Sequence, residues 1–167
     1  MSRELDLRDL YAASAGRLVA QVYGLTGDFG EAQDAVQEAF AKAVARPGLL
    51  RGVDNPEAWL RTVAMNIARS RHRRRAFLDT VVRTGRLRPA DPVPPISPDH
   101  VALVAALQTL PRAVRETVVL HHIADLPVTE VATALGCSVE AVKTRLVRGR
   151  RAMAKHLEET NRENSRA

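Results

Sequence analysis

The sequence is poor in cysteine, in aromatic residues and in long apolar runs. Cys137 is the single cysteine among 167 residues, so the chain can form neither an internal disulfide nor a cysteine-based zinc site. Aromatic residues make up 4% of the chain, and no apolar run approaches the roughly 18 residues that a membrane span needs. The first residues mix acids with leucines and lack the basic-then-apolar order of a secretory signal. We therefore expect one domain, or two small ones, in the cytoplasm.

Positive charge is concentrated in the middle of the chain. The formal net charge is +6, and residues 69–98 alone contain eight basic and two acidic side chains. Residues 1–68 contain seven basic and nine acidic side chains, and residues 99–167 contain ten and eight. The middle segment opens with five arginines and no acid among them: Arg69, Arg71, Arg73, Arg74 and Arg75. Such a cluster favours contact with a polyanion, with a solvated helix face as the alternative.

Apolar spacing predicts three helices in the first 76 residues. The three- and four-residue spacing of an amphipathic helix covers residues 7–25, 32–44 and 60–67. Asn55 followed by Pro56 is typical of a helix start, with asparagine as the N-cap and proline as the first helical residue. The second helix has an acidic outer face. These three helices are expected to form one small domain.

A helix-turn-helix is predicted near the C-terminus, after two helices over about 101–110 and 111–122. Gly136 ends a short helix, and Ser138 caps a longer one from about Val139 to Leu157. Helical geometry puts the apolar residues of the longer helix on one side and a basic face opposite them, consisting of Lys143, Thr144, Val147, Arg148 and Arg151. Such a face can enter the DNA major groove. A packed helical hairpin with a solvated outer face is the alternative.

The expected fold class is all-α, because no alternating run is long enough for a sheet. We expect two small helical domains joined by a flexible linker. The three-helix domain covers residues 1–76, an arginine- and proline-rich linker covers 77–98, the helix-turn-helix domain covers 99–160, and a polar tail covers 161–167.

No set of residues predicts catalysis, a cofactor or a metal site. Asp34 and Glu38 lie one helical turn apart, but such a pair is far more often a docking or solvated face than a pair of catalytic carboxylates. His121 and His122 are adjacent, so on a helix they point about 100° apart and do not form a metal-binding pair. We therefore expect a binding protein and not an enzyme.

Three blocks of the sequence resemble a known family. They read LTGDFGEAQDAVQEAFAKA, NPEAWLRTVAMNIARSRHRRR and LPRAVRETVVLHHIADLPVTEVATALGCSVEAVKTRLVRGRRAM. In this order they are similar to the sigma factors of bacterial RNA polymerase, of the compact extracytoplasmic-function (ECF) group. The resemblance implies a transcription initiation factor that binds core RNA polymerase, directs it to promoters and helps to melt the downstream element. The implied partners are the clamp of the largest polymerase subunit, the flap region and promoter DNA. The resemblance also allows an anti-sigma factor as a partner.

The resemblance also implies roles for individual residues. Those implied to bind core polymerase are Asp34, Gln37 and Glu38. Those implied to capture a flipped base of the downstream (minus-ten) element and its phosphates are Leu50, Arg51, Gly52, Asn66, Arg69 and Arg73. Those implied to read the upstream (minus-thirty-five) element are Lys143, Thr144, Val147, Arg148 and Arg151. Ser70 stands where many members of the family have Asp, so the promoter preference stays open.

A free-standing helix-turn-helix regulator is the alternative function. Such a regulator binds operator DNA as a dimer and reads a palindrome with half-sites about one helical turn apart. A sigma factor instead uses two unlike, separated elements, and it binds DNA weakly without core polymerase.

Overall fold

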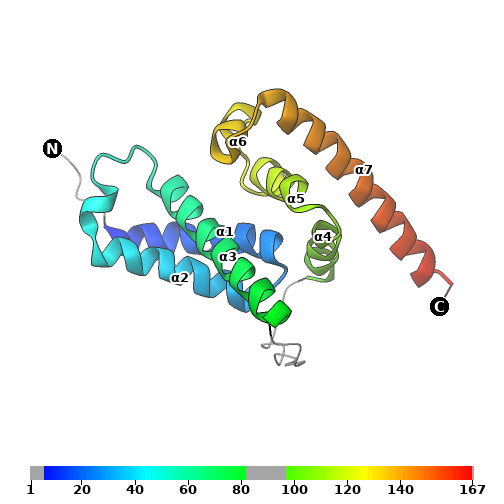
Figure 1. Ribbon diagram of the computed structural model, residues 1–167, viewed down its shortest axis with the longest axis horizontal. Coiled ribbons are helices and arrows are strands. Elements are labelled where there is room, and N and C mark those ends of the chain that lie inside the picture. The colour runs from blue at the N-terminus through cyan, green and yellow to red at the C-terminus, as the bar shows by residue number, and fades with distance from the viewer. Residues whose placement is uncertain (1–5, 82–96, 167) are drawn as a thin grey trace. The chain divides into compact units, whose positions relative to one another are not determined.

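The computed structural model describes residues 6–81 and 97–166, and within these ranges the chain is helical, without a strand. The predicted all-α class is confirmed. The chain forms two compact units (Figure 1). The first contains the helices up to residue 81, apart from the segment Tyr23–Gly27. The second contains that segment and the helices from residue 98 onward.

Three α-helices build the described part of the first unit, as the apolar spacing predicts. Their bounds are α1 Leu7–Thr26, α2 Phe29–Ala45 and α3 Pro56–Val81, with a 3-10 turn, η1, at Pro47–Leu50. The core contains large apolar side chains that are almost fully buried, including Leu18, Val22, Val36, Phe40 and Leu60. The buried face of α2 also carries four small residues, Ala32, Ala35, Ala39 and Ala43. Small side chains there allow α3 to pack closely against α2.

Side-chain caps fix the starts of α2 and α3. The Oδ1 of Asp28 accepts a hydrogen bond from the backbone N–H of Glu31 at 2.9 Å. The Oδ1 of Asn55 accepts one from the backbone N–H of Ala58 at 3.0 Å. Each cap satisfies a donor that the first turn of a helix leaves without an intrahelical partner. The predicted start of α3 at Asn55 is confirmed.

The third helix is longer than predicted. The sequence interpretation ended the first domain at residue 76, whereas α3 continues to Val81, so residues 77–81 of the expected linker are helical. The physical reason is that neither glycine nor proline follows Pro56 before Gly85, and no local signal stops the helix. Residues 82–96 of the expected linker lie outside the described residues.

Four α-helices build the described part of the second unit. Their bounds are α4 Pro98–Gln108, α5 Arg112–Val118, α6 Val128–Leu135 and α7 Val139–Asn164, with a π turn, η2, at Val119–Ile123. The core is made of small and medium aliphatic side chains that are nearly or fully buried, including Val104, Leu107, Leu110, Val119, Val131 and Val142. The helices of this unit therefore pack around an aliphatic core.

The guanidinium of Arg115 satisfies backbone carbonyls where α4 ends. It donates hydrogen bonds to the carbonyl oxygens of Leu107 at 3.0 Å, Gln108 at 3.2 Å and Leu110 at 3.0 Å. Partial burial lowers the pKa of Arg115 from its usual value, but a guanidinium stays protonated in folded proteins. Arg115 therefore anchors the turn between α4 and α5.

The segment after α5 differs from the prediction. The sequence interpretation continued one helix through His122, whereas the backbone widens into the π turn at Val119–Ile123. There the Nδ1 of His121 hydrogen-bonds with the carbonyl oxygen of Leu126 at 2.8 Å, and Asp125 adopts a left-handed φ of 56°. Apolar spacing does not distinguish a single π turn from the α-helix around it, so the pattern could not reveal this feature.

The turn between α6 and α7 agrees with the prediction. Gly136 has a left-handed φ of 62°, which glycine adopts without steric cost. The Oγ of Ser138 accepts a hydrogen bond from the backbone N–H of Ala141 at 3.1 Å. The predicted helix-turn-helix, with a short first helix and a longer second one, is confirmed.

The last helix is also longer than predicted. The prediction ended it near Leu157 and placed a polar tail at residues 161–167, whereas α7 runs to Asn164. Neither glycine nor proline follows Gly149, so nothing in the sequence interrupts the helix. A pair with i,i+4 spacing, Lys155 and Glu159, lies along this extension with Nζ and Oε1 4.0 Å apart.

Candidate nucleic-acid interface

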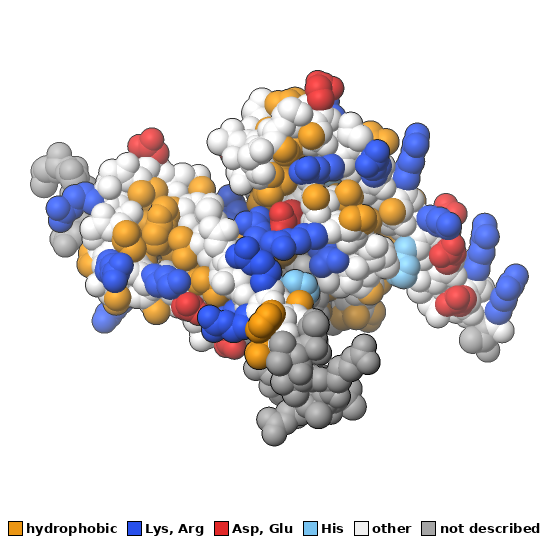
Figure 2. Space-filling model, viewed as in Figure 1, with side chains coloured by type: hydrophobic (Ala, Val, Ile, Leu, Met, Phe, Trp, Pro, Cys, Tyr) orange, Lys and Arg blue, Asp and Glu red, His pale blue; other side chains and the backbone are white. Residues whose placement is uncertain are grey.

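The exposed face of α7 carries the residues predicted to enter the major groove. All five side chains are exposed: Lys143, Thr144, Val147, Arg148 and Arg151. They occupy the first half of α7, while Val142 and Leu146 on the opposite face are buried. The Nζ of Lys143 lies 3.5 Å from the Oε1 of Glu140, which is itself highly exposed. Figure 2 shows Lys and Arg side chains projecting along α7, with acidic side chains between them towards its C-terminal end.

Gly149 allows α7 to pack closely against α5. A Cβ atom at Gly149 would lie 2.6 Å from Cγ2 of Val118 and 3.2 Å from Cγ1 of Val114. Real Cβ atoms do not approach a neighbour as closely as 2.6 Å, so the packing requires glycine at this position. Sequence reasoning missed this requirement. The available signal was a glycine in register with Val142 and Leu146 on the buried face.

The acidic face of α2 carries the residues predicted to bind core polymerase. Asp34 and Gln37 are exposed, while Glu38 is half-buried and has two basic partners. Its Oε2 lies 2.6 Å from Nη2 of Arg71 on α3, and its Oε1 lies 3.4 Å from Nζ of Lys42 on α2. The acidic face is therefore partly neutralised within the unit.

The arginine run of α3 divides into residues with and without counter-charges on α2. Arg71 pairs with Glu38, and Arg75 forms an ion pair with Glu31. Arg73 is exposed and has no ion pair among the described residues. The sequence interpretation counted acids inside the run alone, and it missed these partners because they lie on another helix. Two of the five arginines are therefore less available to a polyanion than predicted.

The loop before α3 and Asn66 are the predicted contacts to a flipped base. Leu50 is half-buried, while Arg51 and Gly52 are exposed, and Gly52 has a left-handed φ of 78°. Asn66 lies ten residues into α3, about 15 Å along the helix axis from Pro56. Its Oδ1 accepts a hydrogen bond from Nη1 of Arg69 at 2.8 Å. Within the described residues, no hydrogen bond joins Asn66 to the loop.

A groove of about 480 Å³ lies between α2 and α3. Its lining consists of Glu38, Lys42, Val63, Asn66, Ile67, Ser70, Arg71 and Arg74. The lining of the groove thus includes Glu38, a residue predicted to bind polymerase, and Asn66, a residue predicted to bind DNA. Three of the lining side chains are cationic and one is a carboxylate, which gives the groove a net positive charge. Such a lining favours an anionic group.

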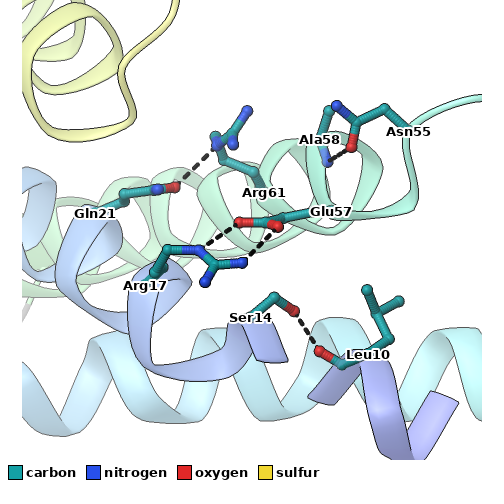
Figure 3. Close-up of polar contacts among 8 residues, drawn as sticks. All are labelled: Leu10, Ser14, Arg17, Gln21, Asn55, Glu57, Ala58 and Arg61. Atoms are coloured by element: carbon teal, nitrogen blue, oxygen red, sulfur yellow. Dashed lines mark hydrogen bonds and ion pairs between the residues drawn. The ribbon is translucent and has the colours of Figure 1, made fainter. Parts of the chain in front are cut away.

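Polar contacts hold α3 against α1 (Figure 3). Nε and Nη2 of Arg17 donate to the two carboxylate oxygens of Glu57 at 3.1 and 2.9 Å. Nε of Arg61 donates to Oε1 of Gln21 at 2.8 Å, and both of these side chains are buried. The hydrogen bond from Arg17 lowers the pKa of the Glu57 carboxyl from its usual value. These contacts limit the rotation of α3 about its axis and so fix where its arginines point.

Two adjacent histidines occupy the π turn. The ring centroids of His121 and His122 lie 4.8 Å apart with the rings steeply inclined. Burial lowers the pKa of His122, and the positive charges of His121 and Arg150 lower it further. Within the described residues, no group of three or more His, Cys, Asp or Glu side chains is placed to hold a metal ion.

None of the described helices is both long enough and apolar enough to span a membrane.

Two family models match this chain, one in each half of the sequence. The family model of sigma-70 region 2 matches residues 10–77, and that of sigma-70 region 4 matches residues 100–153. The ECF RNA polymerase sigma factor EcfG of Rhodopseudomonas palustris is 31% identical over 86% of this chain and 81% of its own length. SigE of Mycolicibacterium smegmatis, also an ECF sigma factor, is 31% identical over 91% of this chain and 63% of its own length.

Solved structures share the fold. The sigma factor RpoE in its co-crystal structure with the anti-sigma factor NepR from Bartonella quintana has a TM-score of 0.76 at 24% identity, over 90% of this chain and 96% of that chain. CnrH, in complex with the cytosolic domain of CnrY, has a TM-score of 0.66 at 24% identity, over 92% and 88%. Fold and sequence together define a helical protein with sigma-70 regions 2 and 4. The chain belongs to the ECF sigma factors, the transcription initiation factors that direct RNA polymerase to promoters.

Proposed function

We propose that this chain confers promoter specificity through three surfaces: the acidic face of α2, the loop before α3 together with α3 itself, and the basic face of α7. The observation that carries the proposal is the α7 face, which is basic and exposed along half of a helix whose opposite side is buried. This helix follows a glycine turn and a shorter helix, which is the geometry with which a helix-turn-helix enters the major groove.

The α7 face is the proposed reader of the upstream element. Lys143 and Arg148 can donate to the N7 and O6 acceptors of guanine, and Arg148 can do so with two parallel hydrogen bonds. Thr144 and Val147 present methyl groups that can contact the methyl group of thymine. Arg151 lies one turn beyond Arg148 and suits a backbone phosphate.

The first unit is the proposed reader of the melted downstream element. The Asn66 amide can both donate to and accept from the edge of an unstacked base. The loop residues Leu50, Arg51 and Gly52 are the second contact to that base. Arg69 and Arg73 lie on the same helix as Asn66, where guanidinium groups suit the phosphates on either side of the base.

The α2 face is the proposed docking surface for core polymerase. Asp34, Gln37 and Glu38 favour a basic partner surface, and we assign this partner to the clamp of the largest polymerase subunit. We assign the flap region to the second unit and promoter DNA to both units. An anti-sigma factor is a further proposed partner, because the sigma factor RpoE, which shares this fold, was solved in complex with one. We expect the chain to act in the cytoplasm without catalysis, cofactor or metal of its own.

Reconstitution with core polymerase tests the proposal. The chain and core are mixed, and transcription is measured from a library of candidate promoters. We expect a complex with core and promoter-dependent transcripts. Absence of both would contradict the proposed function.

A charge-reversal variant tests the docking face separately. Asp34→Lys combined with Glu38→Lys should weaken core binding while the helix content stays unchanged. The matched control is Glu158→Lys combined with Glu163→Lys, which makes the same charge change at exposed positions near the end of α7. Equal core affinity of the two double variants would contradict docking through α2.

A further inference from the structure

Glu38 connects the two functions proposed for the first unit. It belongs to the face that would dock on polymerase, and its carboxylate is bound to an arginine of the helix that would hold DNA. We propose that Glu38 is an internal counter-ion that screens Arg71 in the free chain, and that a basic partner which draws Glu38 away opens the groove between α2 and α3 to a backbone phosphate of single-stranded DNA. This inference rests on the proposed function, because it assumes that α2 docks on polymerase and that α3 binds DNA.

The contacts of Glu38 show how the screening works. Its Oε2 lies 2.6 Å from Nη2 of Arg71, and its Oε1 lies 3.4 Å from Nζ of Lys42. Both oxygens of one carboxylate therefore face cations of the groove. A guanidinium offers a limited set of N–H donors in a fixed fork, and a donor engaged by a carboxylate is not available to a phosphate.

The charge of the groove depends on where Glu38 points. Lys42, Arg71 and Arg74 line it together with Glu38, and two neutral side chains, Asn66 and Ser70, add hydrogen-bonding groups. With the carboxylate inside, the three cations and one anion leave the lining at +2. Withdrawal of the carboxylate would raise this charge to +3 and release the Nη2 donor of Arg71. The anion that α3 would meet on DNA is a backbone phosphate diester, whose oxygens accept hydrogen bonds from guanidinium groups.

Exposure distinguishes the releasable ion pair from a fixed one. The Glu38 side chain is 39% exposed, so a partner on the surface of α2 can reach it. The second pair between these helices joins Arg75 to Glu31, whose side chain is only 15% exposed. The Glu31 pair therefore serves as a structural contact, while the Glu38 pair lies where an incoming cation can compete for it.

Binding of polymerase through Glu38 and binding of DNA through Arg71 strengthen each other. If a basic side chain of polymerase takes Glu38, Arg71 gains affinity for phosphate, and by linkage DNA on Arg71 raises the affinity of Glu38 for that basic group. The coupling is small, because an ion pair at this exposure is worth about a twofold to fivefold change in affinity. The free chain is thus biased against DNA, and the bias is removed in the polymerase complex.

The test measures binding of the full-length chain to a short fluorescent single-stranded DNA of mixed sequence, by anisotropy at low salt. Glu38→Gln removes the counter-ion with little change in shape. Asp34→Asn is the matched control, since it removes one negative charge one turn away on the same helix and no ion pair joins Asp34 to the described residues. We expect Glu38→Gln to tighten binding by the free chain about twofold to fivefold, and clearly more than Asp34→Asn.

Two further arms decide between outcomes. In a background without either cationic partner of Glu38, Arg71→Gln combined with Lys42→Gln, the extra gain of Glu38→Gln over Asp34→Asn should disappear, and at saturating core polymerase it should disappear as well. Equal gains for the two carboxylate variants, or a gain that persists without both cations, would overturn the screening. DNA binding by none of the proteins, free or with core, would instead contradict the proposed function and the inference with it.

Discussion

The arginine run of α3 and the basic face of α7 are both cationic helix surfaces, but they differ in their counter-charges. On α3, Arg71 and Arg75 are paired with carboxylates that come from α2. On α7, Arg148 and Arg151 are exposed without an ion pair among the described residues, and Lys143 has only a highly exposed neighbour, Glu140. The positive charge of the α3 run is thus partly neutralised, whereas that of the α7 face is available to a partner.

Clustering of basic residues along a sequence therefore does not measure how available they are to a polyanion in the folded chain. The partner of Lys143 is three residues away and can be read from the helical period. The partner of Arg71 is 33 residues away on another helix and depends on how α2 and α3 pack. A run of basic residues therefore attracts a polyanion less than its composition predicts when an antiparallel helix beside it carries acidic residues.

Apolar packing behind α7 holds its basic face in place, and disrupting this packing should have the strongest effect of the variants considered. Gly149→Val should destabilise the second unit by about 3 kcal/mol, because the new side chain would overlap Val118. The measurement is chemical denaturation followed by circular dichroism. Gly16→Val in α1 is the matched control, since nothing lies within 4 Å of a Cβ there, and it should change stability by less than about 0.5 kcal/mol. Similar losses for both variants would refute the close packing at Gly149.

The next effect tests whether the open α7 surface reads bases. Arg148→Ala should weaken binding of the polymerase complex to the upstream element by about 1–3 kcal/mol, if its guanidinium forms two hydrogen bonds with one guanine. Competition between matched and mismatched promoter DNA measures this loss. Arg162→Ala, at an exposed position near the end of α7, is the control and should have little effect. A loss of equal size on every DNA sequence would assign Arg148 to a phosphate instead.

A smaller effect compares arginines within the α3 run. Arg73→Ala should lower the salt dependence of single-stranded DNA binding by the free chain, with the slope of log affinity against log salt falling by about 0.7 for one lost phosphate contact. Arg71→Ala should change this slope less, because Glu38 already neutralises Arg71 in the free chain. Titrations at several salt concentrations measure both slopes. A larger change for Arg71 than for Arg73 would contradict the difference between paired and exposed arginines.

The smallest effect concerns the pair that holds α3 on α1. The pKa of Glu57 is lowered in the folded chain by the hydrogen bond from Arg17, so the stabilisation is present above the unfolded-state pKa of about 4.3 and is lost as pH falls through the lower folded value. Glu57→Gln should reduce the free energy of unfolding by less than about 1 kcal/mol at pH 7, because the pair is partly exposed. Denaturation at pH 7 and at acidic pH measures the change. A deficit that is unchanged in acid would show that the ion pair is not its cause.

Local signals predicted most of the fold. Asn55 and Ser138 cap helices where the sequence places them, and Gly136 takes the left-handed conformation that ends α6. Each of these features depends on a few neighbouring residues, so a single sequence contains the required information. The ends of α3 and α7 were placed too early, because the helices continue where composition changes but no breaking residue occurs.

Features that depend on packing could not be predicted in the same way. The π turn comes with a hydrogen bond between His121 and the carbonyl oxygen of Leu126, and the close contact of Gly149 with Val118 depends on the distance between α5 and α7. The ion pair of Glu38 with Arg71 likewise needs two helices to be placed side by side. Among the site residues, the α7 face could be predicted from the helical period, which places it opposite the buried Val142 and Leu146, and it is exposed. The roles of the α2 face and of Asn66 rest on the family resemblance instead.

Sequencing the DNA that the chain selects, with and without core polymerase, separates a sigma factor that reads two elements from a regulator that reads one. Two unlike, separated elements recovered only in the presence of core are the predicted result, because the two units carry different binding surfaces and act together on polymerase. A palindrome with half-sites about one helical turn apart, recovered without core, would contradict the account and identify a dimeric helix-turn-helix regulator.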